Sequence, residues 1–277
     1  MTGNNQEQLY QKKKQVLLKH LKVIEKQEKK LFEDKESTLF MSKINPIIAK
    51  VQDKVPVKLK ATLDKAFYKG FRLVFDKGST YIEKTYQKDK LQLEYDLNNY
   101  AVEKYASKKL IKRLDKQSNR SNLINSSIAV IEGGVLGFLG IGLPDIPLFI
   151  AVIIRNLNEI ALSYGFHYDT PEEKNYQLIL ICGALTKAEA QMKYSEDADI
   201  LGARMDSGIT ADIGDRDYVR ETADLLSDTL LTTKFIQGIP LVGIIGGAVN
   251  HTVITKINRY ARIKYKKRYL QNKVNAL

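Results

Sequence analysis

The chain has 277 residues, of which 44% are hydrophobic, so it can fold around a sizeable core and is not a disordered polymer. It carries a formal net charge of +12, and its one cysteine, Cys182, excludes an internal disulfide. The first eight residues show neither an apolar signal region nor a glycine at position two, which together with the cysteine usage predicts a cytoplasmic protein.

The charge is unevenly distributed. Residues 1–120 hold 28 Lys and Arg against 15 Asp and Glu, residues 121–250 hold 8 against 17, and residues 251–277 hold 8 against 0. This arrangement suits an anionic membrane surface or an acidic partner protein at least as well as a nucleic acid. Trp is absent and the tyrosines follow helical patterns, so no platform for stacked bases is evident and nucleic acid is the least favoured partner.

The first predicted element is a lysine-rich helix, which we assign to an N-terminal extension over residues 1–50. Its narrow apolar stripe recurs at helical steps, at Tyr10, Leu17, Leu21, Ile24 and Leu31. Such a helix can lie on the outside of a bundle, form a short coiled coil, or rest its lysines on an anionic surface. A solvated outer face is the favoured interpretation, because runs of charge usually indicate one.

Helical patterns continue through residues 51–120, without a strand signal. Pro46 and Pro56 favour helix starts, and a wide apolar face from Leu63 to Val74 predicts a core helix that ends at Gly78. A short helix is expected near residues 81–86 and a longer one over residues 91–114, and the polar run at residues 118–122 predicts a loop or a new helix cap.

Residues 128–156 form the longest apolar run. The 21 residues from Leu123 to Leu143 are long enough to cross a bilayer. However, Glu132 would lie near the middle, at a cost of roughly 2.5–3.5 kcal/mol, so a simple span is disfavoured.

Glycines in this run offer a different role. Gly133, Gly137 and Gly140 share one helical face, where another backbone can approach closely. Residues 236–250 contain a second glycine-rich apolar stretch. Two packed glycine-rich helices, either buried or dipped into lipid, are therefore the predicted centre of an all-α, compact multi-helix bundle over residues 51–277.

Asp145 is predicted to cap a helix that begins at Ile146, with Pro147 in its first turn and Gly165 beyond its end. Arg155 and Glu159 are four residues apart on this helix, a spacing that permits an ion pair. The pair could brace the helix or bind a ligand, and the brace is favoured.

A capping box follows at Thr170–Glu173, and Cys182 lies within the next apolar face, as a core residue and not a nucleophile. The acidic stretch 195–228 lacks the spacing of a calcium loop, so it predicts acidic helix starts and loops that face water. A further helix is expected from Asp215.

The C-terminal helix begins in the second glycine-rich stretch and ends in a polybasic segment. Its cations have no acidic neighbour in the sequence and are Arg259, Arg262, Lys264, Lys266, Lys267 and Arg268. Basic residues next to an apolar segment are attracted to anionic lipid by about 1 kcal/mol each, so membrane contact is predicted for these six. A solvated tail or an RNA contact would give the same pattern.

The stretch GGVLGFLGIGLPDIPLFIAVIIRNLNEIALSYGFHYDTPEE, followed downstream by IPLVGIIGGAVN and a basic helix, resembles the EcsC protein family. The likeness runs from about Lys58 to the C-terminus and leaves the first fifty or so residues outside. It implies an all-helical, mainly bacterial family, named from a gene neighbourhood with an ABC transporter and without an assigned reaction. By that likeness, the candidate ligand-binding positions are Glu132, Asp145, Pro147, Arg155, Glu159 and Asn250, although no role comes with them.

Catalytic motifs are not evident: His20, His167 and His251 lie far apart in sequence, and no GxSxG or P-loop is present. No cofactor or metal is expected, and the sequence favours a non-enzyme. The predicted function is a peripheral accessory or adaptor on the inner face of the plasma membrane, docking on anionic lipid or a membrane protein complex through its basic ends and glycine-rich helices. The alternative is a soluble small-ligand binder or enzyme with a site at Glu132, Asp145 and Arg155. The oligomeric state is left open.

Overall fold

The computed structural model describes residues 3–33, 57–120, 145–209, 216–236 and 247–277, and all regular structure within these ranges is helical. The predicted all-α class is confirmed, whereas most of the two glycine-rich stretches that we expected at its centre lies outside the described residues. The helices are α1 (Gly3–Phe32), α3 (Val57–Leu73), α4 (Ser79–Glu83), α5 (Lys88–Tyr105), α6 (Lys108–Arg120), α8 (Asp145–Ser163), α9 (Pro171–Leu185), α10 (Ala188–Asp206), α11 (Tyr218–Ile236) and α12 (Gly247–Asn275).

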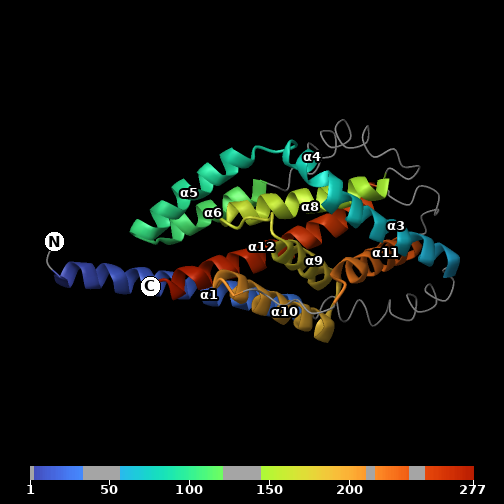
Figure 1. Ribbon diagram of the computed structural model, residues 1–277. Helices are drawn as coiled ribbons and strands as arrows, with labels where there is room; N and C mark the ends of the chain where they lie inside the picture. Colours follow the sequence, from blue (N-terminus) through green and yellow to red (C-terminus); the bar gives the residue numbers. More distant parts are fainter. Residues whose placement is uncertain (1–2, 34–56, 121–144, 210–215, 237–246) are drawn as a thin grey trace.

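The C-terminal helix α12 runs through the middle of the bundle (Figure 1) and contacts α1, α8, α9, α10 and α11. Its 29 residues span about 44 Å at 1.5 Å per residue. Apolar and aromatic side chains on several sides of it are buried, among them Ile257, Tyr260 and Tyr265. The most basic segment of the chain is therefore a central element of the fold.

Helix α8 is the most apolar part of the core. Its residues Ile146–Ser163, with a mean hydropathy of 1.5, are long and apolar enough to cross a membrane, but 89% of them are buried inside the protein. A core helix of a helical domain has the same length and composition. The burial of α8 between α3, α5, α6 and α12 therefore accounts for its composition without a membrane.

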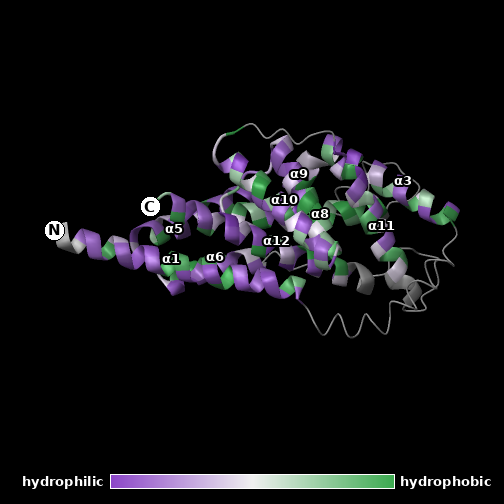
Figure 2. Ribbon diagram, turned by 90° about the horizontal axis from the view of Figure 1, so that it is seen from below, coloured by the Kyte–Doolittle hydropathy of each residue, from purple (hydrophilic) through white to green (hydrophobic). Residues whose placement is uncertain are grey.

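Helix α1 lies antiparallel to α12 and also touches α10 (Figure 1). Its stripe faces the bundle, with Leu17 and Ile24 buried, while the rest of its surface is mostly hydrophilic (Figure 2). The Tyr10 hydroxyl donates a hydrogen bond of 2.8 Å to a main-chain oxygen of Leu277, which connects α1 to the segment that follows α12. Of the three expected arrangements, the structure shows the helix on the outside of a bundle.

The helix boundaries predicted at Gly78 and within residues 91–114 are wrong. Gly78 does not end its helix, because the chain passes through a π turn, Val74–Gly78, directly into α4. Val74 and Ile82 are buried on either side of Gly78, so tertiary packing carries the helix through the glycine. The helix predicted over residues 91–114 breaks at Ala106, whose backbone is extended (ψ 115°), and the Ser107 hydroxyl accepts a hydrogen bond from the backbone N–H of Leu110 at the start of α6.

The helix ends around α8 and α9 follow the prediction. Gly165 has a positive φ of 81°, and the Thr170 hydroxyl accepts a hydrogen bond of 3.1 Å from the Glu173 backbone N–H. The Glu173 side chain, however, is buried and bonded to α12. Helix α11 begins at Tyr218, later than the predicted Asp215, and Asp217 accepts a hydrogen bond from the Arg220 backbone N–H.

Gly165 provides a test of the packing behind α8. A Cβ added there would overlap the ring of Tyr95. The positive φ of this position would also hold the backbone of the new residue in the left-handed region, which residues other than glycine rarely adopt. We expect Gly165→Ala to lower the free energy of unfolding by about 2–5 kcal/mol, measured by urea denaturation. Gly208 has a φ of 67° and open space around it, so Gly208→Ala should cost only about 1–2 kcal/mol. Equal losses in the two variants would refute the close approach of Tyr95.

Candidate functional site

The six basic residues predicted to contact a membrane divide into two opposite faces of α12. At 100° per residue, Lys264, Lys267 and Arg268 project to one side of the helix. The other three, Arg259, Arg262 and Lys266, project to the opposite side. The first set points into the protein, and the second set lines a pocket on its surface.

The inward lysines form a buried ion network with α1 and α10. Lys264 donates to Glu28 at 2.7 Å and to Asp199 at 2.6 Å, and Lys267 donates to the other oxygens of the same two carboxylates at 2.6 Å each. Burial alone would raise the pKa of Glu28, but the charge of Lys264 and the hydrogen bonds from both lysines hold that pKa below its usual value. Helix α1 is thereby fixed to the centre of the bundle.

Arg268 makes a second connection, to α9 and α10. Its guanidinium donates to Glu173 at 2.8 Å and forms a two-pronged pair with Asp206 at 2.6 and 2.8 Å. The same group lies 4.0 Å from the centre of the Phe166 ring. A planar guanidinium is well suited to this combination of bidentate pairing and stacking.

These contacts correct two expectations. Lys264, Lys267 and Arg268 are buried and paired with carboxylates, so they are not available to an external lipid surface in this structure. The acidic stretch does not simply face water, because Asp199 and Asp206 supply those partners. The sequence pattern could not predict these ion pairs, because the paired residues lie on different helices.

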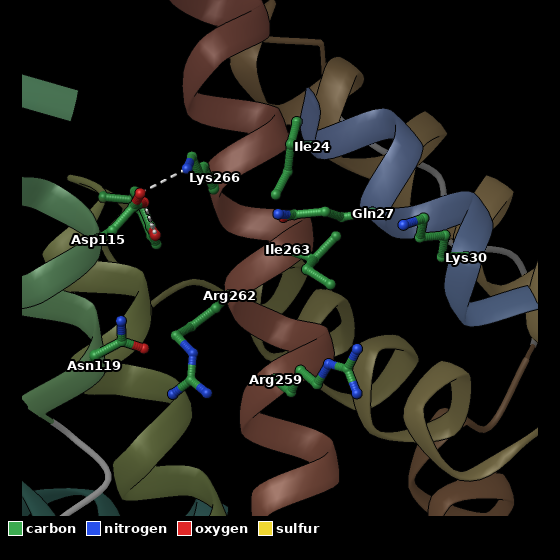
Figure 3. A pocket seen from close by; sticks show the side chains of 10 residues that line it. Ile24, Gln27, Lys30, Asp115, Asn119, Arg259, Arg262, Ile263 and Lys266 are labelled. Carbon is green, nitrogen blue, oxygen red and sulfur yellow. Dashed lines mark hydrogen bonds and ion pairs between the residues drawn. The ribbon is translucent and has the colours of Figure 1, made fainter. Parts of the chain in front are cut away.

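The outward residues line a cationic pocket of about 340 Å³ between α1, α6 and α12 (Figure 3). We define the cationic pocket by its lining residues, which are Ile24, Gln27, Lys30, Asp115, Asn119, Tyr164, Arg259, Arg262, Ile263 and Lys266. Four basic side chains and one acidic side chain give the lining a net charge of +3. The size is at the lower end of the range for small-ligand sites.

The acidic member of the pocket is already neutralised. Asp115 accepts a hydrogen bond of 2.7 Å from Lys266 and one of 3.2 Å from the Tyr164 hydroxyl. The surroundings of Arg262 disfavour its charged form. Burial lowers the pKa of its guanidinium, Tyr164 opposes that shift, and the charge of Arg259 adds to it. The ionisable groups of Arg259, Arg262 and Tyr164 are therefore close enough to influence one another within the pocket lining.

None of the candidate ligand-binding residues taken from the family likeness is among the described residues that line the cationic pocket. Arg155 and Glu159 form the predicted ion pair on α8, at 3.0 Å, with side chains only 12% and 11% exposed. Pro147 is buried in the first turn of α8. Asp145 begins α8 and Asn250 lies in the first turn of α12, but their side chains, like the whole of Glu132, lie outside the described residues. The structure thus places Arg155 beside Glu159 and gives no geometry for the three-residue site.

Cys182 is a core residue, as predicted. Its side chain is fully buried, and its sulfur lies 3.2 Å from the Thr222 hydroxyl. Burial raises the pKa of the thiol to about 12. A thiol in this environment is not a nucleophile near neutral pH, because only the thiolate reacts.

Sequence reasoning missed half of the cationic pocket. Gln27 and Lys30 come from α1, Asp115 and Asn119 from α6, and Tyr164 follows α8. These residues are far apart in the sequence and share no local motif. Of these five residues, only Tyr164 lies in the stretch that resembles the EcsC family, directly after the end of α8.

The fold and this pocket define an all-helical protein with a positively charged surface site. The EcsC protein family matches residues 18–270, most of the chain, and the protein belongs to that family. The match begins within α1, so it includes residues that we expected to lie outside the likeness.

One curated relative is the "Uncharacterized protein YdbA" of Bacillus subtilis (strain 168), which is 28% identical over 153 residues. This alignment covers 54% of the chain and 54% of the relative, so it spans about half the length of each. No solved structure matches the chain.

The buried ion network generates a stability prediction. Lys264→Met leaves Glu28 with half of its counter-charge inside the protein, so we expect a loss of about 3–5 kcal/mol in the free energy of unfolding. Lys273→Met is the matched control, since Lys273 pairs with Glu103, whose side chain is 47% exposed, and should cost less than about 1 kcal/mol. Urea denaturation followed by far-UV circular dichroism measures both, and a similar small loss in the two variants would contradict the structural role of the network.

Proposed function

We propose that the protein is a peripheral membrane protein that docks on an anionic lipid surface and acts there as an accessory or adaptor to a membrane complex. The cytoplasmic face of the plasma membrane is the proposed location, since its lipids carry the negative charge that such docking needs. The proposal concerns a binding role and involves no reaction.

The observation that carries the proposal is a group of exposed cations for which the described residues provide no ion pair. Lys30, Lys187, Lys256 and Arg259 are all exposed, and they line the cationic pocket and an adjoining hollow of about 200 Å³ that shares Arg259 with it. We call these four residues the basic face. Among the described residues that line the adjoining hollow, none is acidic.

The basic face is also close in sequence to an apolar segment. Lys256 and Arg259 lie on α12, shortly after the glycine-rich stretch of residues 236–250. Basic residues that follow an apolar segment are suited to the boundary between lipid headgroups and water. Four such cations would contribute about 4 kcal/mol on an anionic surface, a contribution that salt screens within about 8 Å at physiological ionic strength.

The alternative, a ligand site around Arg155, receives less support from the contacts. The guanidinium of Arg155 is already paired with Glu159 one helical turn away, and both side chains are nearly buried. A pair of this kind braces a helix within a core. We therefore place the functional surface at the basic face and not at Arg155.

Flotation with lipid vesicles tests the proposal. We expect the protein to bind phosphatidylcholine vesicles only when they contain phosphatidylglycerol, and to lose most of this binding at high salt. The variant Lys30→Gln/Lys187→Gln/Lys256→Gln/Arg259→Gln should bind more than about tenfold more weakly, because each cation contributes about 1 kcal/mol.

The matched control removes four exposed lysines that line neither the cationic pocket nor the adjoining hollow, in Lys77→Gln/Lys84→Gln/Lys90→Gln/Lys104→Gln. It has the same net charge as the test variant and should bind nearly as well as the unmodified protein. If the control variant loses as much binding, attraction depends on total charge and the basic face has no special role. If the unmodified protein ignores anionic vesicles, the docking proposal fails.

A further inference from the structure

We infer that the adjoining hollow is a specific site for one phosphate group, held by Lys187, Lys256 and Arg259. The inference deepens the proposed docking role, because it assigns three cations of the basic face to a single bound group. It rests on that role only for the source of the phosphate. A lipid headgroup and a soluble phosphate ester both present this chemical group.

The three cations meet from two parts of the chain. Lys256 and Arg259 lie one turn apart on α12, and Tyr260 follows on the same side of that helix. Lys187 lies at the junction of α9 and α10, and it lines the adjoining hollow together with these three residues. Arg259 extends from α12 on the side away from Arg262 (Figure 3). The guanidinium of Arg259 is therefore placed for this hollow.

The charged groups in the described lining of the hollow are all positive. Lys187 comes from the start of α10 and the other two cations from α12, whereas α1 contributes Leu31 and α9 contributes Ala184. The Lys256 side chain reaches solvent, yet the protein packed around it lowers the pKa of its ammonium to about 8, with the charge of Lys187 as a second cause. An anion bound beside two ammonium groups that repel each other relieves that repulsion.

The start of α10 adds to this attraction. Lys187 is the N-cap residue of the 19-residue helix, and its side chain makes no capping hydrogen bond to the helix that it begins. Main-chain N–H groups without helical partners give a helix start a partial positive charge, which favours anions. Because Thr186, Lys187 and Gln191 all line the hollow, this end of α10 borders the site that the three cations form.

Hydrogen bonding and size favour a small oxyanion over other ligands. The Thr186 hydroxyl and the Gln191 amide already donate to main-chain carbonyls of α9, so the hollow is better suited to recognise charge than a neutral polar molecule. Its volume of about 200 Å³ is below the usual range for sites that enclose a whole metabolite, but it has room for a tetrahedral oxyanion. The Arg259 guanidinium presents the planar fork that binds phosphate oxygens in pairs.

Calorimetric titration with inorganic phosphate, at constant ionic strength in chloride buffer, tests the site directly. We expect saturable binding by the unmodified protein. Lys187→Gln/Lys256→Gln should weaken this binding by at least about tenfold, because two of the three cations are lost. The matched control is Lys29→Gln/Lys30→Gln, which removes two exposed lysines of α1 from outside the described lining of the hollow and should leave the affinity within about twofold.

Proton uptake tests the role of Lys256 independently. With a pKa of about 8, this ammonium is half deprotonated at pH 8, and a bound dianion raises the pKa, so binding should take up as much as about half a proton. At pH 6 the ammonium is already charged, and the uptake should vanish. Titration with sulfate, a dianion at both pH values, in buffers of different ionisation enthalpy measures the uptake, and Lys256→Gln should abolish it. Sulfate binding without uptake at pH 8 would overturn the inference.

Urea denaturation of both double variants checks that they remain folded. All four lysines are exposed and lie outside the buried ion network, so we expect normal folding. If Lys187→Gln/Lys256→Gln does unfold, the single variant Lys256→Gln and its proton uptake decide the matter. Absence of saturable phosphate binding by the unmodified protein overturns the inference, and so does equal weakening in the α1 control.

Vesicle flotation then separates the two sources. Phosphatidic acid has a phosphomonoester headgroup, whereas phosphatidylglycerol has a phosphodiester, so vesicles matched in surface charge isolate the chemistry of the group. A preference for phosphatidic acid that disappears in Lys187→Gln/Lys256→Gln supports the site with a lipid ligand. Phosphate binding without that preference supports the site with a soluble ligand.

These outcomes keep the two proposals distinct. Phosphate binding by a protein that ignores every vesicle supports the site in the hollow and rejects membrane docking. Docking on anionic vesicles without phosphate binding or a preference for phosphatidic acid rejects the site and leaves the docking proposal standing.

Discussion

The structure depends on the neutralisation of buried positive charge along α12. Moving an ion from water into a protein interior costs several kcal/mol unless a partner of opposite charge is already in place. Lys264, Lys267 and Arg268 meet this condition through carboxylates on α1, α9 and α10. The positions of those three helices are therefore fixed by ion pairing as well as by apolar contact, and a shift of any one of them would leave a buried charge without its partner.

The uneven charge of the sequence follows from this arrangement. The acidic part of the chain, together with Glu28 of α1, provides the counter-ions for the basic C-terminal helix, so much of the apparent polybasic character is satisfied internally. The charge that remains available belongs to cations that no carboxylate of the described residues pairs with. Four of them form the basic face, close to where α1 and α12 lie against each other.

Features that depend on neighbours in the sequence could be predicted. The all-helical class, the Thr170 cap, the stop at Gly165 and the Arg155–Glu159 pair all arise within one or two helical turns. The break at Ala106 was missed because a single serine cap gives a weak signal beside a continuous apolar pattern. Half of the pocket could not be predicted either, since Lys30, Asn119 and Arg259 meet only after three helices have packed. The burial of the basic helix could not be predicted for the same reason, because the paired residues Glu28 and Lys264 are 236 residues apart in the sequence.

The two faces of α12 alternate within ten residues, and this places a limit on how the segment can change in evolution. One inserted or deleted residue between Arg259 and Arg268 would turn everything on one side of it by 100°. Cations that line the pocket would then be driven toward the core, while their buried neighbours would swing away from Glu28 and Asp199. Point substitutions can be absorbed one position at a time, but a change in length cannot, so this part of α12 should keep a constant length among relatives that share the fold even where its amino acids differ.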